Sequence, residues 1–265
     1  MLRILAQLVS CVKVVYFKTI KMNKAIKCLI PLSCIWRIVK IRSFEFTILA
    51  IAFVCITAMV AFGLTTYFDG IITKWVKSLQ GNQKMDIFMI IITSFSDVST
   101  LVIIGVILTI IRRTRRMGLI FLLSMVFIAI SIIYIKPLIG RHAPSEGFRS
   151  SFILPKHFAL EDDSVTPSAR DYSYPSNHLA IVTALVFMVG FEVNKKSRIG
   201  GIMIWAFPAL IGMSKLYLMQ HYFADIVGGF LLGLIISIIT SNVMHLDQPF
   251  LMSRFKGKDI DSARY

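Results

Sequence analysis

The chain contains a series of apolar runs that are long enough, or nearly long enough, to cross a lipid bilayer as helices. A spanning helix needs roughly 20 predominantly apolar residues. Six runs approach or exceed this length, at about 46–67, 87–111, 117–135, 176–193, 199–219 and 222–241. The chain is 56% hydrophobic and only 16% charged, with a mean hydropathy of +0.75, whereas soluble domains carry about 25% charged residues. The sequence therefore predicts an all-α protein, a six-transmembrane helix bundle.

The net charge of +15 lies in short basic clusters that flank the apolar runs. A basic N-terminal region (1–45), the cluster RRTRR (112–116) and the turn NKKSR (194–198) fall on one side of the six-span layout. Lysine and arginine are enriched in cytoplasmic loops, so this side is predicted to be cytoplasmic and to include the tail 242–265. Membrane topology therefore accounts for the basic residues, and no nucleic-acid partner is predicted. No recognisable nucleic-acid-binding module is present in the sequence. We expect a multi-pass protein of the cell membrane.

The layout predicts one six-span domain at 46–241 and leaves the N-terminal 45 residues open to two interpretations. That region is either an interfacial helix on an anionic leaflet or a poorly ordered tail. The long polar loop at 137–174 and the turn at 219–222 face the extracytoplasmic side. A loop as long as this one is usually functional or disordered.

Polar groups that are costly inside a membrane gather at this extracytoplasmic face. They lie in three stretches, KPLIGRHAP (136–144), YPSNH (174–178) and SKLYLMQHYFAD (214–225). In the third stretch the spacing of His221 and Asp225 puts both side chains on one face of a helix start. The carboxylate can fix the imidazole tautomer and leave the other nitrogen free to attack as a nucleophile. The alternative is that His221 and Asp225 only satisfy each other.

The second stretch predicts an anion site at the start of the fourth span. Pro175 suits the first turn of a helix, and the backbone N–H groups there, with the Ser176 hydroxyl, can bind an anion. His178 could then protonate a leaving oxygen as a general acid. Lys136 and Lys215 complete a phosphate pocket. The alternatives are an ordinary N-cap at Ser176 or Asn177 and lysines that reach the headgroups at the membrane surface.

Together these stretches resemble the type 2 phosphatidic acid phosphatase superfamily of membrane lipid phosphatases. The family pattern is Lys-x6-Arg-Pro, then Pro-Ser-Gly-His, then Ser-Arg-x5-His-x3-Asp. This chain has Lys136-x6-Ala143-Pro144, Pro175-Ser176-Asn177-His178 and Ser214-Lys215-x5-His221-x3-Asp225. The order and spacing of the motifs agree over about 46–241. Asparagine replaces the glycine, lysine replaces the second arginine, and alanine replaces the first.

The resemblance implies a phosphohydrolase that needs no metal and no cofactor. His221 would form a phosphohistidine with Asp225 orienting it, and His178 would protonate the leaving group and then help to activate water. Lys136, Ser176, the Asn177 backbone and Lys215 would hold the phosphate oxygens. Lysine offers a point charge in place of the planar fork of arginine and Ala143 donates nothing, so Arg141 is the nearest candidate to replace the missing arginine.

The substrate class that the resemblance implies is a lipid mono- or diphosphate, with a polyprenyl diphosphate favoured over phosphatidate. The partners are then the bilayer and a membrane lipid phosphate, and the oligomeric state stays open. Two other functions remain: a lipid phosphotransferase that uses the same phosphohistidine, and a catalytically weak lipid-binding or transport relative. The combination of His178, His221 and Asp225 argues against the last, because binding alone needs neither an acid nor a nucleophile.

Overall fold

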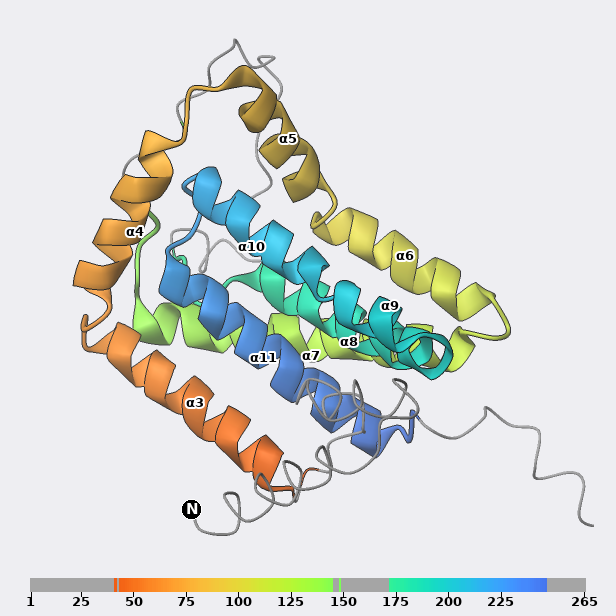
Figure 1. The fold of residues 1–265 in the computed structure, drawn as a ribbon. Helices are drawn as coiled ribbons and strands as arrows, with labels where there is room; N and C mark the ends of the chain where they lie inside the picture. Colours follow the sequence, from red (N-terminus) through yellow and green to blue (C-terminus); the bar gives the residue numbers. More distant parts are fainter. Residues whose placement is uncertain (1–40, 42, 145–147, 149–171, 247–265) are drawn as a thin grey trace, which may run out of the picture. The chain divides into compact units, whose positions relative to one another are not determined.

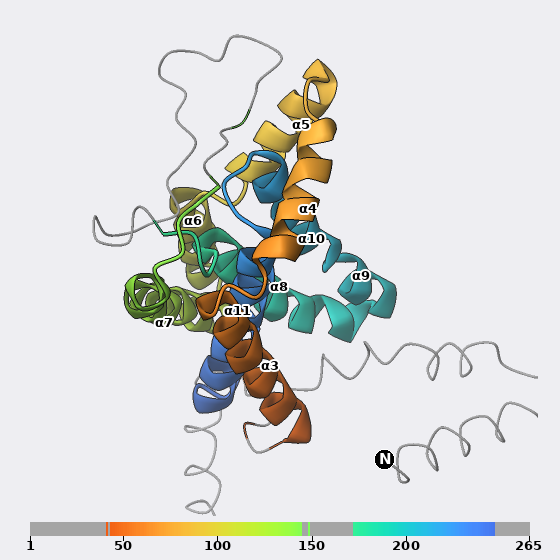
Figure 2. The same ribbon diagram turned by 90° about the vertical axis from the view of Figure 1, so that its left-hand side faces the viewer.

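The computed structural model describes residues 41, 43–144, 148 and 172–246. Apart from an isolated antiparallel bridge between His142 and Tyr172, the regular structure of these residues is helical. The helices are α3 (Phe44–Ala61), α4 (Thr66–Ser78), α5 (Gln83–Ser94), α6 (Val98–Ile110), α7 (Arg115–Ile139), α8 (Asn177–Lys196), α9 (Arg198–Met203), α10 (Ala206–Tyr217) and α11 (Phe223–Val243). All belong to one unit of the chain, Ile38–Tyr265, and are drawn in Figures 1 and 2. The predicted all-α class is confirmed.

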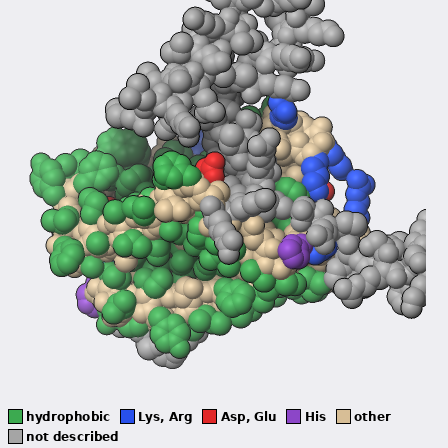
Figure 3. All heavy atoms as spheres, turned by 90° about the horizontal axis from the view of Figure 1, so that it is seen from below, with side chains coloured by type: hydrophobic (Ala, Val, Ile, Leu, Met, Phe, Trp, Pro, Cys, Tyr) green, Lys and Arg blue, Asp and Glu red, His purple; other side chains and the backbone are tan. Residues whose placement is uncertain are grey.

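Five segments are long and apolar enough to cross a membrane: α3, α7, α8, α11 and the α9–α10 segment Arg198–Tyr217. Helices α5 and α6 meet the same criteria as a pair bent by 48°, which gives six spans when the pair is counted as one. Large apolar side chains are exposed on these helices, for example Val54, Ile103 and Val126, and such surfaces mark contact with a membrane or a partner. Figure 3 shows hydrophobic side chains over much of one face. The chain is a multi-pass membrane protein, as predicted.

Several predicted regions lie outside the residues that the structure describes. These are most of the basic N-terminal region, most of the polar loop at 137–174 and residues 247–265 of the predicted tail. The described residues begin just before α3 and end just after α11. The fold that positions the site is therefore the set of helices from α3 to α11.

The second predicted span, 87–111, is not one straight helix. It divides at 95–97 into α5 and α6, where two polar residues interrupt the apolar run. The Ser96 hydroxyl donates to the Thr93 carbonyl oxygen at 2.7 Å, and Asp97 occupies the N-cap position of α6. Serine and aspartate offer the backbone such alternatives to a continuous helix.

The third predicted span, 117–135, continues further than the sequence indicated. Helix α7 runs through Pro137 to Ile139 and ends at Gly140, which has the left-handed φ of 65° and donates its N–H to the Lys136 carbonyl oxygen. Glycine adopts this conformation at little cost and commonly ends helices. As a result Lys136 lies inside the last turn of α7, not beyond the helix.

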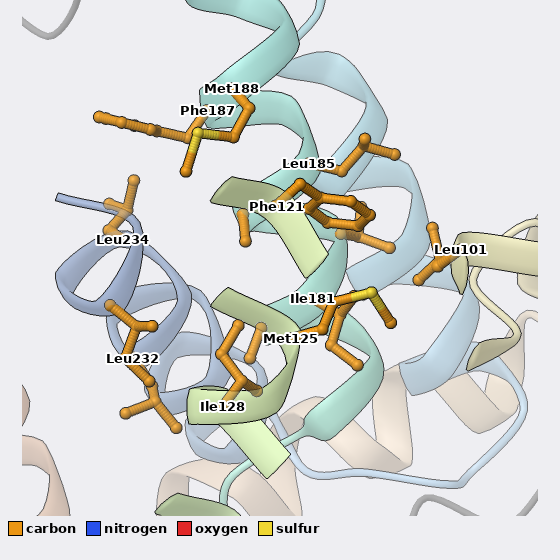
Figure 4. Close-up of a cluster of buried hydrophobic side chains, with 14 of the residues drawn as sticks. Leu101, Phe121, Met125, Ile128, Ile181, Leu185, Phe187, Met188, Leu232 and Leu234 are labelled. Carbon is orange, nitrogen blue, oxygen red and sulfur yellow. The ribbon is translucent and has the colours of Figure 1, made fainter. Parts of the chain in front are cut away.

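Most of the buried apolar side chains form one cluster at the centre of the helices (Figure 4). They come chiefly from α7, α8 and α11, and include Phe121, Met188 and Leu232, with Leu101 from α6. Helix α11 packs against α8, α3 and α7, and α10 packs against α5 and α8. This packing leaves α8 and α11 as the most enclosed spans, each 72% buried over its apolar window. Of the two histidines that the sequence singled out, His178 lies in the first turn of α8 and His221 lies just before α11.

Three glycines let α11 approach the start of α8 very closely. A Cβ atom at Gly229 would lie 2.4 Å from the Ser176 carbonyl oxygen, and one at Gly233 would lie 2.3 Å from the Ala180 carbonyl oxygen. A Cβ at Gly228 would lie 2.5 Å from the Tyr174 ring. Small residues allow helix backbones to meet closely in membranes. The close approach holds the YPSNH stretch against the first turns of α11.

We expect Gly229→Ala to destabilise the protein by about 3 kcal/mol, which is near the upper end of the usual cost of overpacking a core. The reason is that the nearest atom, the Ser176 carbonyl oxygen, belongs to the backbone and cannot move aside. Thermal unfolding in detergent measures the effect. Gly70→Ala in α4 is the matched control, since no atom lies within 4 Å of a Cβ placed there and alanine favours helix. Equal melting temperatures for Gly229→Ala and the wild type would contradict this account of the packing.

Candidate active site

The first turn of α11 holds Asp225 and places His221 just outside the helix. Tyr222 is the N-cap residue, and its backbone N–H donates to Asp225 Oδ2 at 2.9 Å. His221 Nδ1 lies 3.8 Å from the same oxygen, which is longer than a hydrogen bond. The prediction that both residues lie on one helical face is wrong, because the capping box starts the helix after His221. The two groups are nevertheless adjacent, and catalytic hydrogen bonds often tighten only when substrate is bound.

The side chain of Arg141 reaches the other oxygen of Asp225. Its Nη1 donates to Asp225 Oδ1 at 2.9 Å, and its Nη2 donates to Oδ2 of Asp69. The guanidinium also lies over the Tyr222 ring, 4.3 Å from the ring centroid. Burial raises the pKa of the Tyr222 hydroxyl, although the Arg141 cation acts to lower it. Arg141 is thus held against Asp225, the residue whose other carboxylate oxygen lies near His221.

Asp69 is the residue of this site that sequence reasoning missed. It lies on α4, is buried with 1% of its surface exposed, and accepts a hydrogen bond from the Ala224 N–H at 3.0 Å. The signal was present in the sequence, because Asp69 is the only acidic residue in the amphipathic segment that forms α4. The partners of Asp69 could not be predicted from the sequence, because Arg141 and Ala224 are far from α4 along the chain.

Ser176 and His178 lie at the buried start of α8. Ser176 occupies the N-cap position, but its hydroxyl makes no capping hydrogen bond. That oxygen is buried and has no hydrogen-bond partner among the residues that the structure describes. The Ser176 backbone N–H donates to the Asp225 carbonyl oxygen at 3.1 Å, which joins the start of α8 to the first turn of α11. An ordinary cap would use the hydroxyl, so its position fits an anion ligand better.

Pro175 lies before the N-cap of α8 and not in its first turn, where the sequence had placed it. The helix begins later because Ser176 retains an extended backbone, with φ −68° and ψ 118°. Asn177 and His178 are therefore the first two residues of the helix, and both are buried. The consequence is that His178 lies within the first turn of α8, two residues after the N-cap Ser176.

Lys136 and Lys215 are fully buried, each with 0% exposure. This contradicts the alternative that they reach the membrane surface, because a snorkelling lysine keeps its ammonium group in water. The Lys215 carbonyl oxygen accepts from the Gln220 N–H at 3.1 Å, so the chain folds back tightly between α10 and His221. A buried lysine is expensive unless it is paired or has a function.

The loop that carries Arg141 is bonded to the segment that precedes α8. The Ser173 N–H donates to the Arg141 carbonyl oxygen at 2.8 Å, and the His142–Tyr172 bridge continues this pairing. The Tyr174 hydroxyl hydrogen-bonds with the Thr57 hydroxyl of α3 at 2.8 Å. Burial, only partly offset by that hydrogen bond, raises the pKa of Tyr174 to about 12, so its hydroxyl stays protonated near neutral pH. The first two motifs are thereby fixed to each other.

The structure thus joins residues of all three motifs through direct contacts. Arg141 contacts Asp225, Ser176 contacts Asp225, and His221 lies beside Asp225. Ala143 and its neighbour His142 are exposed, and the His142 ring packs at 5.4 Å against Tyr172. The position that corresponds to the family's first arginine is therefore on the surface, whereas Asp225 and His221 are buried.

Comparisons with known proteins give a family and a fold. Residues 117–249 match the model of the PAP2 superfamily. The chain is also similar to a solved structure described as the first transmembrane PAP2 type phosphatidylglycerolphosphate phosphatase from Bacillus subtilis, with 21% sequence identity and a TM-score of 0.62. That similarity covers 78% of this chain and 100% of the other. A search of curated proteins gives no match.

The matched residues, 117–249, contain the helices from α8 to α11, nearly all of α7, and every motif residue from Lys136 to Asp225. They leave out α3 to α6, and with them Asp69. At 21% identity the structural similarity supports the fold alone. The protein is a member of the PAP2 superfamily.

Proposed function

We propose that the protein is an integral-membrane lipid phosphatase that works through a phosphohistidine on His221. The observation that carries the proposal is the position of His221, beside Asp225 and within one connected set of residues from three motifs. Its Nδ1 faces the Asp225 carboxylate, so Nε2 is the nitrogen left to attack phosphorus. Histidine with an orienting acid is an established type of covalent nucleophile.

The proposed reaction has two displacement steps. In the first, the Nε2 lone pair forms a bond to phosphorus and the bond from phosphorus to the leaving oxygen breaks, while His178 gives that oxygen a proton. In the second, His178 takes a proton from water, the water oxygen bonds to phosphorus, and the phosphorus–nitrogen bond breaks. Inorganic phosphate is released and His221 is restored. The buried position of His178 at the start of α8 suits a group that acts as acid and then as base.

The phosphate oxygens would be held by groups around His221. Lys136 and Lys215 supply buried positive charge, and Ser176 supplies a hydroxyl with the Asn177 backbone beside it. Arg141 completes the set, because its guanidinium carries more N–H groups than its two carboxylate partners use. Such donors, fixed in advance, stabilise the charge that develops in the transition state. No metal and no cofactor takes part in the proposed steps.

We further propose that the substrate is a lipid mono- or diphosphate of the polyprenyl diphosphate or phosphatidate class. The site lies among helices with exposed apolar surfaces, so a lipid can deliver its headgroup from the bilayer. The basic clusters at 112–116 and 194–198 belong on the cytoplasmic side. The site is at the opposite ends of the helices, which favours the extracytoplasmic face of the cell membrane.

Phosphate release from a panel of lipid phosphates in detergent tests this function. We expect release from at least one polyprenyl diphosphate or phosphatidate, with the same rate in the presence of a chelator. No release from any lipid would contradict the hydrolase and favour a binding or transport protein. A chelator-sensitive rate would contradict the metal-free mechanism, and phosphate transfer to an added lipid alcohol without release would indicate a phosphotransferase.

We expect Ser176→Ala to raise KM about 10-fold, the effect of one hydrogen bond to a charged group, without lowering the melting temperature. The hydroxyl has no partner among the described residues, so its loss breaks no bond within them. Ser124→Ala is the matched control, because that buried hydroxyl donates to the Ile120 carbonyl oxygen at 2.8 Å. It should destabilise the fold by about 1 kcal/mol and leave KM unchanged. A lower melting temperature with an unchanged KM would make Ser176 an ordinary cap.

A further inference from the structure

Helix α4 exposes aromatic side chains and buries a carboxylate, the opposite of what a helix in water usually does. Tyr67, Phe68 and Trp75 are exposed, whereas Asp69 is 1% exposed and points toward the other helices. At 13 residues α4 is too short to span a bilayer, and exposed aromatic residues are typical of the membrane interface. A buried carboxylate is costly unless it is paired. Asp69 therefore needs a structural or functional reason for its position.

The partners of Asp69 supply that reason. Its Oδ2 accepts from Arg141 Nη2, and its Oδ1 accepts from the Ala224 N–H at 3.0 Å. Arg141 in turn donates to Asp225 Oδ1 at 2.9 Å, and Ala224 is the residue next to Asp225 in the first turn of α11. Asp69 thus reaches Asp225 by two routes, one through a guanidinium and one through the backbone. Figure 1 shows α4 passing the start of α11, in agreement with their contacts.

We propose that Asp69 is a positioning residue for phosphoryl transfer, an inference that rests on the proposed function. Asp69 holds Arg141 flat between two carboxylates and fixes the first turn of α11, so that Asp225 Oδ2 faces His221 Nδ1. Without Asp69, Arg141 keeps one carboxylate partner and can swing about that contact. Asp69 lies on α4, outside the matched family region.

Two features separate this role from simple stabilisation. The planar fork of arginine can bridge two carboxylates at fixed angles, which a lysine cannot do. In addition, one route from Asp69 reaches Asp225 through Arg141, and the other ends at the N–H of Ala224, the residue directly before Asp225. A displacement of about 1 Å at a catalytic group can cost about 100-fold in rate. The expected effect of losing Asp69 is therefore on the chemical step.

The test is the kinetics of Asp69→Asn in purified full-length protein, with a lipid phosphate that the wild type hydrolyses. We expect kcat to fall about 10- to 100-fold, while KM changes less than about threefold. Asparagine keeps an oxygen for the Ala224 N–H and removes the charge that holds Arg141. Glu192→Gln is the control, because Glu192 is an exposed carboxylate paired with Lys195 and its loss should leave kcat and KM unchanged.

A double-mutant cycle with Arg141→Gln shows whether Asp69 acts through Arg141. We expect the double variant to have the same kcat as Arg141→Gln alone, because the relay is already broken. If Asp69→Asn does not fold, Asp69→Glu provides the same test, since it keeps the charge but adds a methylene that shifts the carboxylate from its place between Arg141 and the Ala224 N–H, and it should also lower kcat. Wild-type kcat in Asp69→Asn, or in Asp69→Glu, would overturn the proposal, as would a double variant whose loss in kcat is the product of the two single losses. A wild type that hydrolyses no lipid phosphate would instead contradict the proposed function itself, and this inference with it.

Discussion

In His221→Asn the rate of phosphate release from every lipid phosphate is expected to fall by about 10³- to 10⁶-fold. Removal of the covalent nucleophile has an effect of this size in other enzymes. Asparagine is polar and similar in length, so it can remain beside Asp225, but its amide nitrogen cannot attack phosphorus. The loss should fall on kcat, because the groups that we propose for phosphate binding remain. Initial rates of phosphate release at saturating substrate in detergent measure it.

The matched control for this variant is His245→Asn. His245 is exposed, just beyond the opposite end of α11, and has a φ of 50°, a conformation that asparagine also tolerates. It should retain the wild-type rate. Melting temperatures should be recorded for both, since His221 is 2% exposed and its replacement could disturb packing. A folded His221→Asn protein that keeps more than about one tenth of the wild-type rate would contradict its role as the nucleophile.

His178→Gln is expected to slow the release of phosphate from lipid substrates by about 10²- to 10⁴-fold, the usual contribution of a general acid or base. The effect should depend on the leaving group. A lipid alkoxide needs a proton as it departs, whereas p-nitrophenolate departs without one. With p-nitrophenyl phosphate, formation of the phosphoenzyme should therefore be nearly as fast in His178→Gln as in the wild type.

The second step still needs a base, so this substrate should give a burst in His178→Gln. One equivalent of p-nitrophenol should appear rapidly, followed by slow turnover, and rapid-quench measurements resolve the two phases. The wild type serves as the control and should show a much smaller burst. Equal losses for lipid and p-nitrophenyl substrates, with no burst, would show that His178 is a structural residue or a phosphate ligand.

The membrane fold could be predicted from the sequence, because span length and apolar content alone determine it. The six predicted spans correspond to α3, the α5–α6 pair, α7, α8, the α9–α10 segment and α11. Hydropathy does not register local hydrogen bonding, so the bend of 48° between α5 and α6 was not foreseen. The extension of α7 past Pro137 was missed for a similar reason, since the left-handed Gly140 and not the proline ends that helix.

The candidate site could be predicted only in part, because motif spacing carries no information on contacts between distant segments. His221 and Asp225 are adjacent as expected, yet the capping box at Tyr222 places His221 outside the helix. Arg141 was predicted to replace the arginine that is missing at position 143. Its ion pairs with both Asp225 and Asp69 could not be predicted, because Asp69 lies on α4. A contact across 72 residues of chain cannot be read from a local pattern.

The burial of Lys136 and Lys215 also required the structure. Each lysine stands near the end of a span, where sequence alone allows the side chain to reach the headgroups. The structure places both inside, with 0% exposure, because α7 continues past Lys136 and the chain turns back sharply after Lys215. Two buried lysines in the motifs that also contain Arg141, His221 and Asp225 support an anionic substrate more strongly than either lysine does alone.

The most direct test of the phosphohistidine mechanism is detection of the covalent intermediate itself. The His178→Gln protein should be mixed with a phosphate-labelled substrate, quenched in alkali, in which phosphohistidine survives, and digested for mass spectrometry. We predict one phosphate on the peptide that contains His221, lost after mild acid and absent from the His178→Gln, His221→Asn double variant. Phosphate on another residue, or turnover by the wild type with no labelled histidine in either protein, would contradict the mechanism.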